Sequence, residues 1–138
     1  WTQTKHARAY QTLVTVQKQF SLDCIRCHVT GWQQPGGVCR IDRTGFGGPG
    51  IDGRGVGRRD VQCEDCHGPG SDHVKDATGA FIRRQVPEGI CTRCHEAANS
   101  PHFNDATYRP FIVGPGHGKP LAKGEKPRPL PGGPGHEE

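Results

Sequence analysis

The stretch that decides the fold is residues 61–74, which read VQCEDCHGPGSDHV. It holds two cysteines three positions apart, a histidine directly after the second cysteine, and a further histidine, His73, six positions later. The turn Gly68-Pro69-Gly70 separates the two histidines, and a helix does not continue through such a turn. The cysteines and His67 therefore indicate a metal or cofactor site, whereas His73 needs an explanation of its own.

The same C-x-x-C-H pattern occurs three times, at Cys24-Ile-Arg-Cys27-His28, Cys63-Glu-Asp-Cys66-His67 and Cys91-Thr-Arg-Cys94-His95. Zinc ribbons and redox C-x-x-C pairs share the cysteine spacing, but neither requires a histidine directly after the second cysteine. The spacing puts both sulfurs on one helical face, where they can add to the two vinyl groups of a haem while the histidine reaches the iron. The pattern predicts three covalent c-type haems with these histidines as proximal ligands.

The composition indicates that apolar side chains alone do not fill the core of this protein. Leu, Ile, Val and Phe supply 24 of 138 residues, while the chain has 21 Gly and 12 Pro. So few apolar side chains cannot offset the ordering entropy of the chain, which leaves it either unfolded or filled by another group. We expect a small, mainly α fold with extensive irregular loops and little or no β-sheet, organised around stacked haems and unable to form without them.

Turn residues and periodicity divide the chain into short elements. Residues 2–20 form the best helix candidate, with His6, Tyr10, Leu13 and Gln17 on one face. Further helices are expected at 21–31, 60–68, 87–98 and 100–109, the last with Ser100 as its cap, and a glycine-rich loop at 33–60. Residues 1–113 are predicted to form one multihaem domain, and residues 114–138 a Pro/Gly-rich extended tail without regular structure.

Methionine is the usual alternative to histidine as the distal iron ligand in cytochromes c, and the chain contains no Met, so the remaining histidines are the candidates. His6 is predicted as a distal ligand because it lies on the apolar stripe of the first helix, and His73 is predicted as a second. His102 and His117 are open candidates, and His136 in the tail is expected to be solvated. An iron with two histidine ligands is saturated, so it passes electrons without binding a substrate.

The order of the motifs resembles the tetrahaem cytochrome c554 family and related multihaem electron-transfer cytochromes. The shared segments span residues 1 to about 113 and are WTQTKHARAYQTL, DCIRCHVTGW, GVGRRDVQCEDCHGPGSDH, CTRCH and TYRPF. Members of this family carry another C-x-x-C-H motif shortly before the tryptophan that matches Trp1. Either a first haem segment, with a fourth haem, precedes Trp1, or the protein is a trihaem variant.

The resemblance implies a crossed pattern of distal ligands. The histidine that matches His6 caps the haem whose proximal ligand is His67, and the histidine that matches His73 reaches the haem of His95. A C-terminal histidine, of which His117 is the nearest counterpart, caps the first haem of the family. His117 is therefore either without a haem in this chain or a ligand to a neighbouring chain's haem.

The haem at Cys24 and Cys27 is the candidate reactive centre. Its counterpart in the family has no distal protein ligand, and a segment that matches residues 108–111 lines the open face. If His102 binds that iron, the protein only carries electrons. If His102 does not, Arg109 can donate hydrogen bonds to a small anion.

Three functions follow from these observations. The leading hypothesis is electron transfer between redox partner proteins, with acidic Glu64 and Asp65 and basic Arg26 and Arg93 separating the haem potentials. The alternatives are reduction of nitric oxide, hydroxylamine or nitrite at the Cys24/Cys27 haem, and a subunit of a polymeric extracellular cytochrome wire or larger redox complex formed with other cytochrome chains.

Charge and redox chemistry restrict the setting of these functions. The net charge of +4 is spread along the chain without the basic stripe of a nucleic-acid-binding protein, and no apolar run could span a membrane. Haem attachment predicts a periplasmic, extracellular or cell-surface location. Cys39 belongs to no motif and is expected to be a buried free thiol, with an intermolecular disulfide as the alternative.

Overall fold

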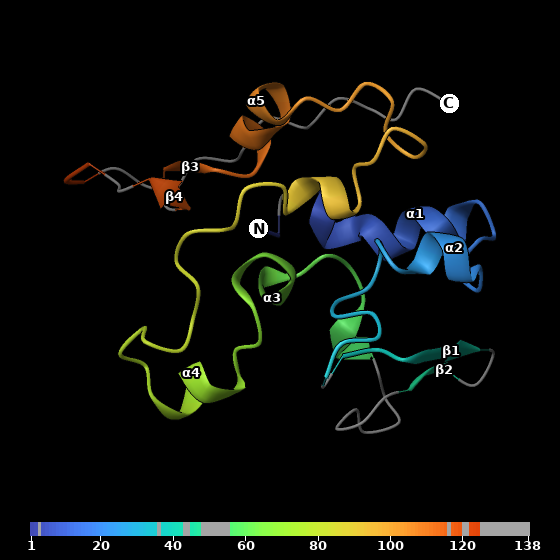
Figure 1. The fold of residues 1–138 in the computed structure, drawn as a ribbon, viewed down its shortest axis with the longest axis horizontal. Helices are drawn as coiled ribbons and strands as arrows, with labels where there is room; N and C mark the ends of the chain where they lie inside the picture. The colour runs from blue at the N-terminus through green and yellow to red at the C-terminus, as the bar shows by residue number, and fades with distance from the viewer. Residues whose placement is uncertain are drawn as a thin grey trace.

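The computed structural model describes residues 1–2, 4–35, 37–42, 45–47, 56–115, 117–119 and 122–124. Short helices joined by long irregular segments make up most of this part of the chain (Figure 1). The helical elements, with η for a 3-10 helix, are η1 (Lys5–Arg8), α1 (Ala9–Thr15), α2 (Leu22–Ile25), η2 (Val56–Arg58), α3 (Cys63–His67), α4 (Ser71–Lys75), η3 (Cys91–Arg93), α5 (Asp105–Tyr108) and η4 (Arg109–Phe111).

The strands described are few and short. Strands β1 (Arg40–Asp42) and β2 (Gly45–Gly47) pair antiparallel with Ile41 opposite Phe46, and β3 (Gly114–Pro115) pairs parallel with β4 (Gly118–Lys119). The expectation of a mainly α fold with little β-sheet is confirmed. The β1–β2 pair lies inside the segment predicted as a glycine-rich loop, of which residues 43–44 and 48–55 lie outside the described part.

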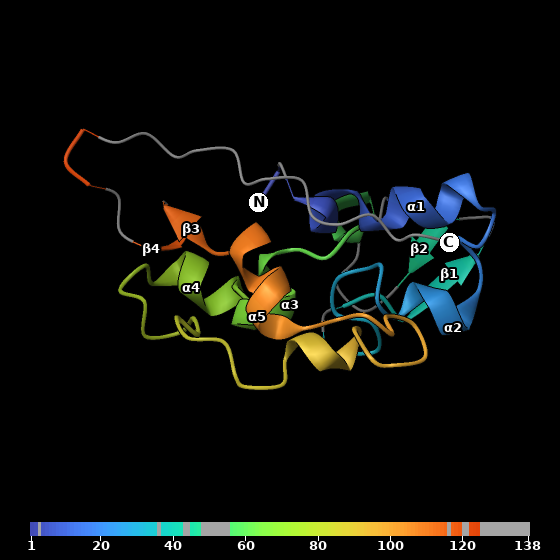
Figure 2. The ribbon, with the colours of Figure 1, turned by 90° about the horizontal axis from the view of Figure 1, so that it is seen from above.

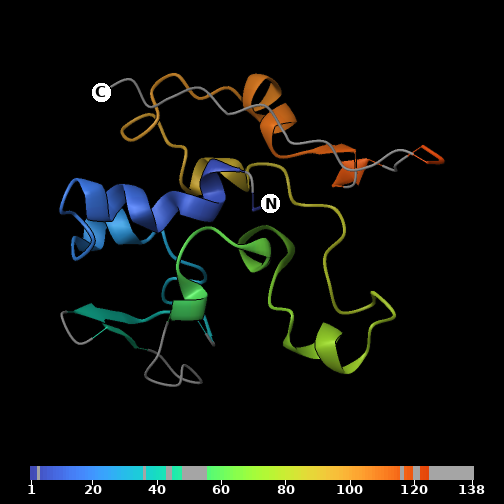
Figure 3. The same cartoon turned by 180° about the vertical axis from the view of Figure 1, so that it is seen from behind.

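The elements separate along the long axis of the molecule. Helices α1 and α2 and the β1–β2 pair gather at one end, whereas α4, β3 and β4 lie at the other end (Figures 1 and 2). Helix α3 lies between these two groups, as the view from behind also shows (Figure 3). None of the helices in the described ranges is long and apolar enough to cross a membrane.

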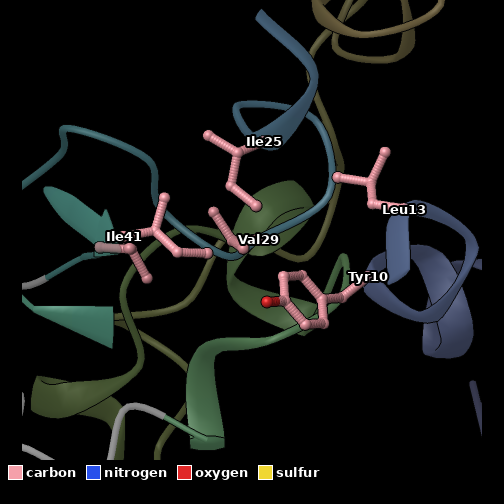
Figure 4. Packing of buried hydrophobic residues seen from close by; sticks show 6 residues of the cluster. Tyr10, Leu13, Ile25, Val29 and Ile41 are labelled. Carbon is pink, nitrogen blue, oxygen red and sulfur yellow. The ribbon is translucent and has the colours of Figure 1, made fainter. Parts of the chain in front are cut away.

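A small hydrophobic core holds the first of these groups together (Figure 4). It consists of six buried side chains from α1, α2, the turns that follow α2, and β1: Tyr10, Leu13, Ile25, Val29, Val38 and Ile41. Burying one such aliphatic side chain contributes about 1.5–3 kcal/mol. The expectation of a chain that wraps haems without any side-chain core is therefore wrong for the N-terminal region.

The first helix is shorter than its sequence predicts. Helix α1 ends at Thr15, because the backbone of Gln17 takes a left-handed conformation (φ 57°) that a helix cannot include. Tyr10 and Leu13 are buried and His6 is half-buried, in agreement with the predicted face. Gln17, which was placed on the same face, lies beyond the helix and is exposed.

The segment immediately before α3 crosses between the first helices and the end of the first C-x-x-C-H motif. On one side, the Val61 amide donates to the His6 carbonyl at 3.1 Å and Asp60 Oδ1 accepts from the Tyr10 amide at 2.8 Å. On the other side, the Asp60 amide donates to the His28 carbonyl at 3.1 Å. These bonds fix the start of α3, and so the second motif, against the N-terminal region.

The later helices also differ from the predictions. Residues 87–98 form turns and η3 in place of the expected helix, and the helix expected to start at Ser100 starts at Asp105. Asn104 is its cap, since its side-chain oxygen accepts from the Thr107 amide at 3.1 Å. Helix α4 after the Gly-Pro-Gly turn was not predicted as a separate element.

Candidate haem-attachment sites

The first motif is built on α2 and the turns that follow it. Ile25 is fully buried in the core, which anchors the helix, and Cys24 packs against the same cluster. His28 Nδ1 lies 2.5 Å from the Ala9 carbonyl of α1, to which the Thr12 hydroxyl also donates at 2.6 Å. Helix α1 therefore sets the orientation of the His28 imidazole.

The second motif is α3 itself. Gln62 and Asp65 form a capping box at its N-terminus, and Gly68 ends it with φ 82°, which only glycine adopts without strain. The predicted stop at Gly68-Pro69-Gly70 is confirmed. His67 Nδ1 lies 2.6 Å from the Arg83 carbonyl, and the Arg83 amide donates to the His67 carbonyl at 3.1 Å. The backbone of Arg83 therefore holds both the imidazole and the main-chain carbonyl of His67.

The third motif begins in η3. The His95 amide donates to the Cys91 carbonyl at 2.9 Å, which closes the motif into a helical turn. His95 Nδ1 lies 3.1 Å from the Ser100 hydroxyl. The ring of Phe103 stacks on the His95 imidazole, with ring centroids 4.5 Å apart and planes inclined by 12°.

All three motif histidines share one hydrogen-bonding feature. In each, Nδ1 faces an oxygen that can accept its proton. The carbonyl partners of His28 and His67 can only accept, so they favour the tautomer with the proton on Nδ1 and the lone pair on Nε2, and the Ser100 hydroxyl can accept the same proton from His95. The six motif cysteines are free thiols in the structure. The donor set therefore fits a haem held by two thioethers and one imidazole at each motif.

The first and third motifs contact each other. Arg26, inside the first motif, forms an ion pair with Glu96, which directly follows His95. The Cys94 thiol hydrogen-bonds to Cys27, which lowers the pKa of Cys27 to about 7 and raises the pKa of Cys94. Two cysteines from motifs far apart in the sequence thus lie side by side.

The first and second motifs are joined through Asp65. Its Oδ1 accepts from the Gly31 amide, three residues after the first motif, at 3.0 Å, and its Oδ2 accepts from the Gln62 amide at 3.1 Å. Burial raises the pKa of Asp65 in spite of these hydrogen bonds. Glu64 forms an ion pair with Arg58, so both carboxylates have partners within the protein.

His6 lies close to two motif histidines. Its ring centroid is 6.0 Å from that of His95, and burial, together with the nearby His95 and His28, lowers the pKa of His6 to about 4. His6 is therefore neutral at pH 7, the form that binds iron. The resemblance pairs His6 with His67 across one iron, whereas in the structure the ring contact of His6 is with His95.

His117 lies beside the second motif. Its ring centroid is 6.1 Å from that of His67, and its Nδ1 lies 2.7 Å from the Ile112 carbonyl. Its Nε2 is thus available in the same way as in the motif histidines.

The remaining histidines are in different environments. His73 lies on α4 and is half-buried, and its Nδ1 is buried without a hydrogen-bond partner. A buried imidazole nitrogen without a partner is unfavourable, and a group that binds this ring would remove the penalty. The His102 side chain is exposed, and His136 lies outside the described residues.

The segment expected to line an open haem lies against the third motif. The ring of Tyr108 is 5.2 Å from that of Phe103 and 6.3 Å from that of His95. The Arg109 guanidinium, which was considered for an anion, donates to Asp105 at 2.8 Å (Nε) and 2.7 Å (Nη2). Cys39 is exposed, so the prediction that its thiol is buried is wrong.

The sequence signal missed the partners of the motif histidines. Ala9 and Arg83 contribute through their carbonyls, which leave no trace in residue type. Ser100 was predicted only as a helix cap. Within the described residues no three His, Cys, Asp or Glu side chains are arranged to hold a metal ion by themselves.

Comparison with known families agrees with this chemistry. Residues 1–68 match the model of the family cytochrome c554 and c-prime. The chain resembles cytochrome c554. The match covers 68 of 138 residues, including the first two motifs, and ends at the glycine that terminates α3. It supports a multihaem c-type cytochrome, with covalent haem c, in electron transfer. No curated protein and no solved structure matches the chain.

Proposed function

We propose that the chain carries electrons between redox partner proteins through three haems c, bound at Cys24/Cys27, Cys63/Cys66 and Cys91/Cys94 with proximal ligands His28, His67 and His95. The observation that carries this proposal is the hydrogen bond at Nδ1 of all three histidines, which fixes the orientation of each imidazole and is compatible with binding of iron through Nε2. A haem iron with imidazoles on both faces supplies reversible one-electron chemistry without an open position.

Contacts between the motifs support a continuous path. The Arg26–Glu96 ion pair holds the first motif against the third, and Asp65 joins the second motif to the end of the first. Because the thiols of Cys27 and Cys94 are in hydrogen-bond contact, haems attached to these two cysteines would be close together. Short separations of this kind are what electron tunnelling requires.

His6 and His73 are proposed as distal ligands. His6 is neutral and half-buried beside two motif histidines, and His73 has a buried nitrogen without a partner. His117 has its Nε2 free beside His67 and is a third candidate, while the exposed His102 is the weakest. Two imidazoles about as far apart as His6 and His95 fit either one iron between them or neighbouring positions on two adjacent irons.

The first experiment counts haems. The intact mass of the protein and the masses of its peptides are expected to give one haem on each C-x-x-C-H peptide. Paired Cys→Ala variants of a single motif should each remove one haem and leave the other two. An intact protein without haem, or with zinc in its place, would refute the proposal. The same mass decides whether a fourth haem segment precedes Trp1.

The second experiment assigns His6. His6→Ala is expected to turn one low-spin haem signal in the electron paramagnetic resonance spectrum into a high-spin signal. Repeating the change in Cys63→Ala/Cys66→Ala protein and in Cys91→Ala/Cys94→Ala protein identifies the haem, because the new signal disappears only when that haem is absent. Loss with the Cys63/Cys66 haem supports the crossed pattern, loss with the Cys91/Cys94 haem supports pairing with His95, and no high-spin signal refutes ligation by His6.

The same spectra separate the electron carrier from the reductase. The unmodified oxidised protein is expected to be entirely low-spin. A high-spin signal that shifts on addition of nitric oxide or cyanide would indicate an open haem at Cys24/Cys27 and a reductase. The pairing of Arg109 with Asp105 gives the reductase no additional support.

The setting of this function follows from haem attachment, and we place the protein outside the cytoplasm, in the periplasm or at the cell surface. We propose residues 1–113 as the haem-binding domain and residues 114–138 as a Pro/Gly-rich extended tail, although the prediction that this tail lacks regular structure is wrong at its start, where β3 and β4 pair. Assembly with further cytochrome chains is tested by the oligomeric state of protein shortened after residue 113. If shortening leaves the oligomeric state unchanged, the tail does not hold an assembly together.

A further inference from the structure

His95 is the motif histidine whose Nδ1 contacts a side chain, the hydroxyl of Ser100. His28 and His67 direct Nδ1 at backbone carbonyls, whereas His95 directs Nδ1 at the Ser100 hydroxyl at 3.1 Å. A backbone carbonyl is present whatever the residue type, but a hydroxyl is set by the sequence. The third motif is thus the one in which a single side chain can change the hydrogen bond of the iron ligand.

The position of Ser100 is fixed from both sides. Its amide donates to the Glu96 carbonyl at 2.8 Å, and its own carbonyl accepts from the Phe103 amide at 3.0 Å. The same turn brings the Phe103 ring onto the face of the His95 imidazole. The hydroxyl fixes one edge of the imidazole and the phenyl ring fixes its plane.

The Ser100 hydroxyl does not cap a helix, although its sequence context predicts that it does. A serine before proline is typical of a helix cap, but the helix here starts at Asp105 with Asn104 as its cap. Ser100 makes no side-chain cap of that helix, and its hydroxyl instead forms a hydrogen bond with His95.

We propose that Ser100 is a positioning residue for the His95 iron ligand, which sets the orientation and basicity of that imidazole and thereby the potential of one haem. The inference rests on the proposed haem at Cys91/Cys94. A proton donated from Nδ1 makes the imidazole a stronger donor at Nε2, which favours ferric over ferrous iron. Loss of the hydroxyl therefore raises the potential of this haem, and the other two keep theirs.

The test compares Ser100→Thr with Ser100→Val, two side chains of nearly equal shape that differ in the hydroxyl. Spectroelectrochemical titration of the holoprotein is expected to give three parent-like potentials for Ser100→Thr. In Ser100→Val one potential moves upward, and one low-spin signal in the electron paramagnetic resonance spectrum changes its g values. Ser71→Ala, which removes an exposed hydroxyl on α4, is the control and should leave both readouts unchanged.

Each outcome decides the inference. Parent-like potentials and g values in Ser100→Val, with all haems attached, refute it, as do equal shifts of Thr and Val or a shift of every haem. If Ser100→Val loses a haem, Ser100→Ala provides the same comparison without the added volume, and loss of the Cys91/Cys94 haem from both while Thr retains it supports the role of the hydroxyl. Absence of haem on the Cys91/Cys94 peptide of the unmodified protein refutes the proposed function itself.

Discussion

The two halves of the molecule are stabilised in different ways. The region before residue 48 contains a core of six buried apolar side chains, whereas none of residues 57–113, all of which the structure describes, is buried. The second region nevertheless contains two of the three attachment motifs and His73. The first region therefore packs on its own side chains, and the lack of buried residues from 57 to 113 is consistent with the proposal that the second region is arranged around groups bound to its cysteines.

The largest difference between the two regions is expected in their amide protection when haem is removed. In protein prepared without haem, residues 69–113 are expected to exchange their amide hydrogens fully within the shortest time measured and to be cut first by protease, since the segment before α3 keeps its hydrogen bonds to the N-terminal region. The segments around α1, α2 and β1 should keep part of their protection, because their core consists of side chains. Hydrogen exchange read by mass spectrometry measures both regions at once. Equal loss of protection in both would contradict the comparison.

Matched truncations measure the same contrast in free energy. Ile41→Ala removes a buried side chain from the N-terminal core and is expected to lower the free energy of unfolding by about 2–5 kcal/mol. Ile82→Ala makes the same chemical change at a half-buried position of the second region, where a loss of about 1 kcal/mol is expected. Denaturant unfolding of the two holoprotein variants checks the order. A larger loss for Ile82 would show a core in the second region that side-chain burial does not reveal.

A smaller effect is expected from the Asp105–Arg109 pair in the second region. The hydrogen bond from Arg109 lowers the pKa of Asp105, so the folded state favours the ionised carboxylate. The resulting stabilisation is present above the pKa of Asp105 in the unfolded chain and is lost as the pH falls through its lower folded-state value. Asp105→Asn should reduce the acid-side slope of the thermal midpoint slightly, and an unchanged slope would show that this exposed pair contributes nothing.

The sequence was informative wherever one residue type determines the local chemistry. Three C-x-x-C-H motifs predicted the attachment sites, and Gly68 correctly ended the helix of the second motif. The helical spacing of Tyr10 and Leu13 identified a buried face of the first helix. These features are local, so they can be read without knowledge of what lies nearby in space.

Features that no residue type marks, whether a local backbone conformation or a contact between distant positions, were not predictable. The end of α1 at Thr15 follows from the left-handed backbone of Gln17, a conformation that a glutamine rarely adopts. The partner of His67 is a carbonyl 16 positions away, and no residue type marks it. The contact of Arg26 with Glu96 joins positions 70 residues apart, beyond any periodicity. Sequence therefore predicts candidate ligands from residue type, but it does not predict the elements that orient them.

The segment before α3 also has a consequence for the order of events during synthesis. The carbonyls of His6 and His28 and the amide of Tyr10 form hydrogen bonds with Asp60 and Val61, which are synthesised more than 30 residues later. A nascent chain that has reached only residue 50 cannot complete this hydrogen bonding. The shortest piece expected to fold as a unit thus extends to about the end of α3, where the family match also ends. An attachment enzyme that acts on the first motif before that point would meet an open chain.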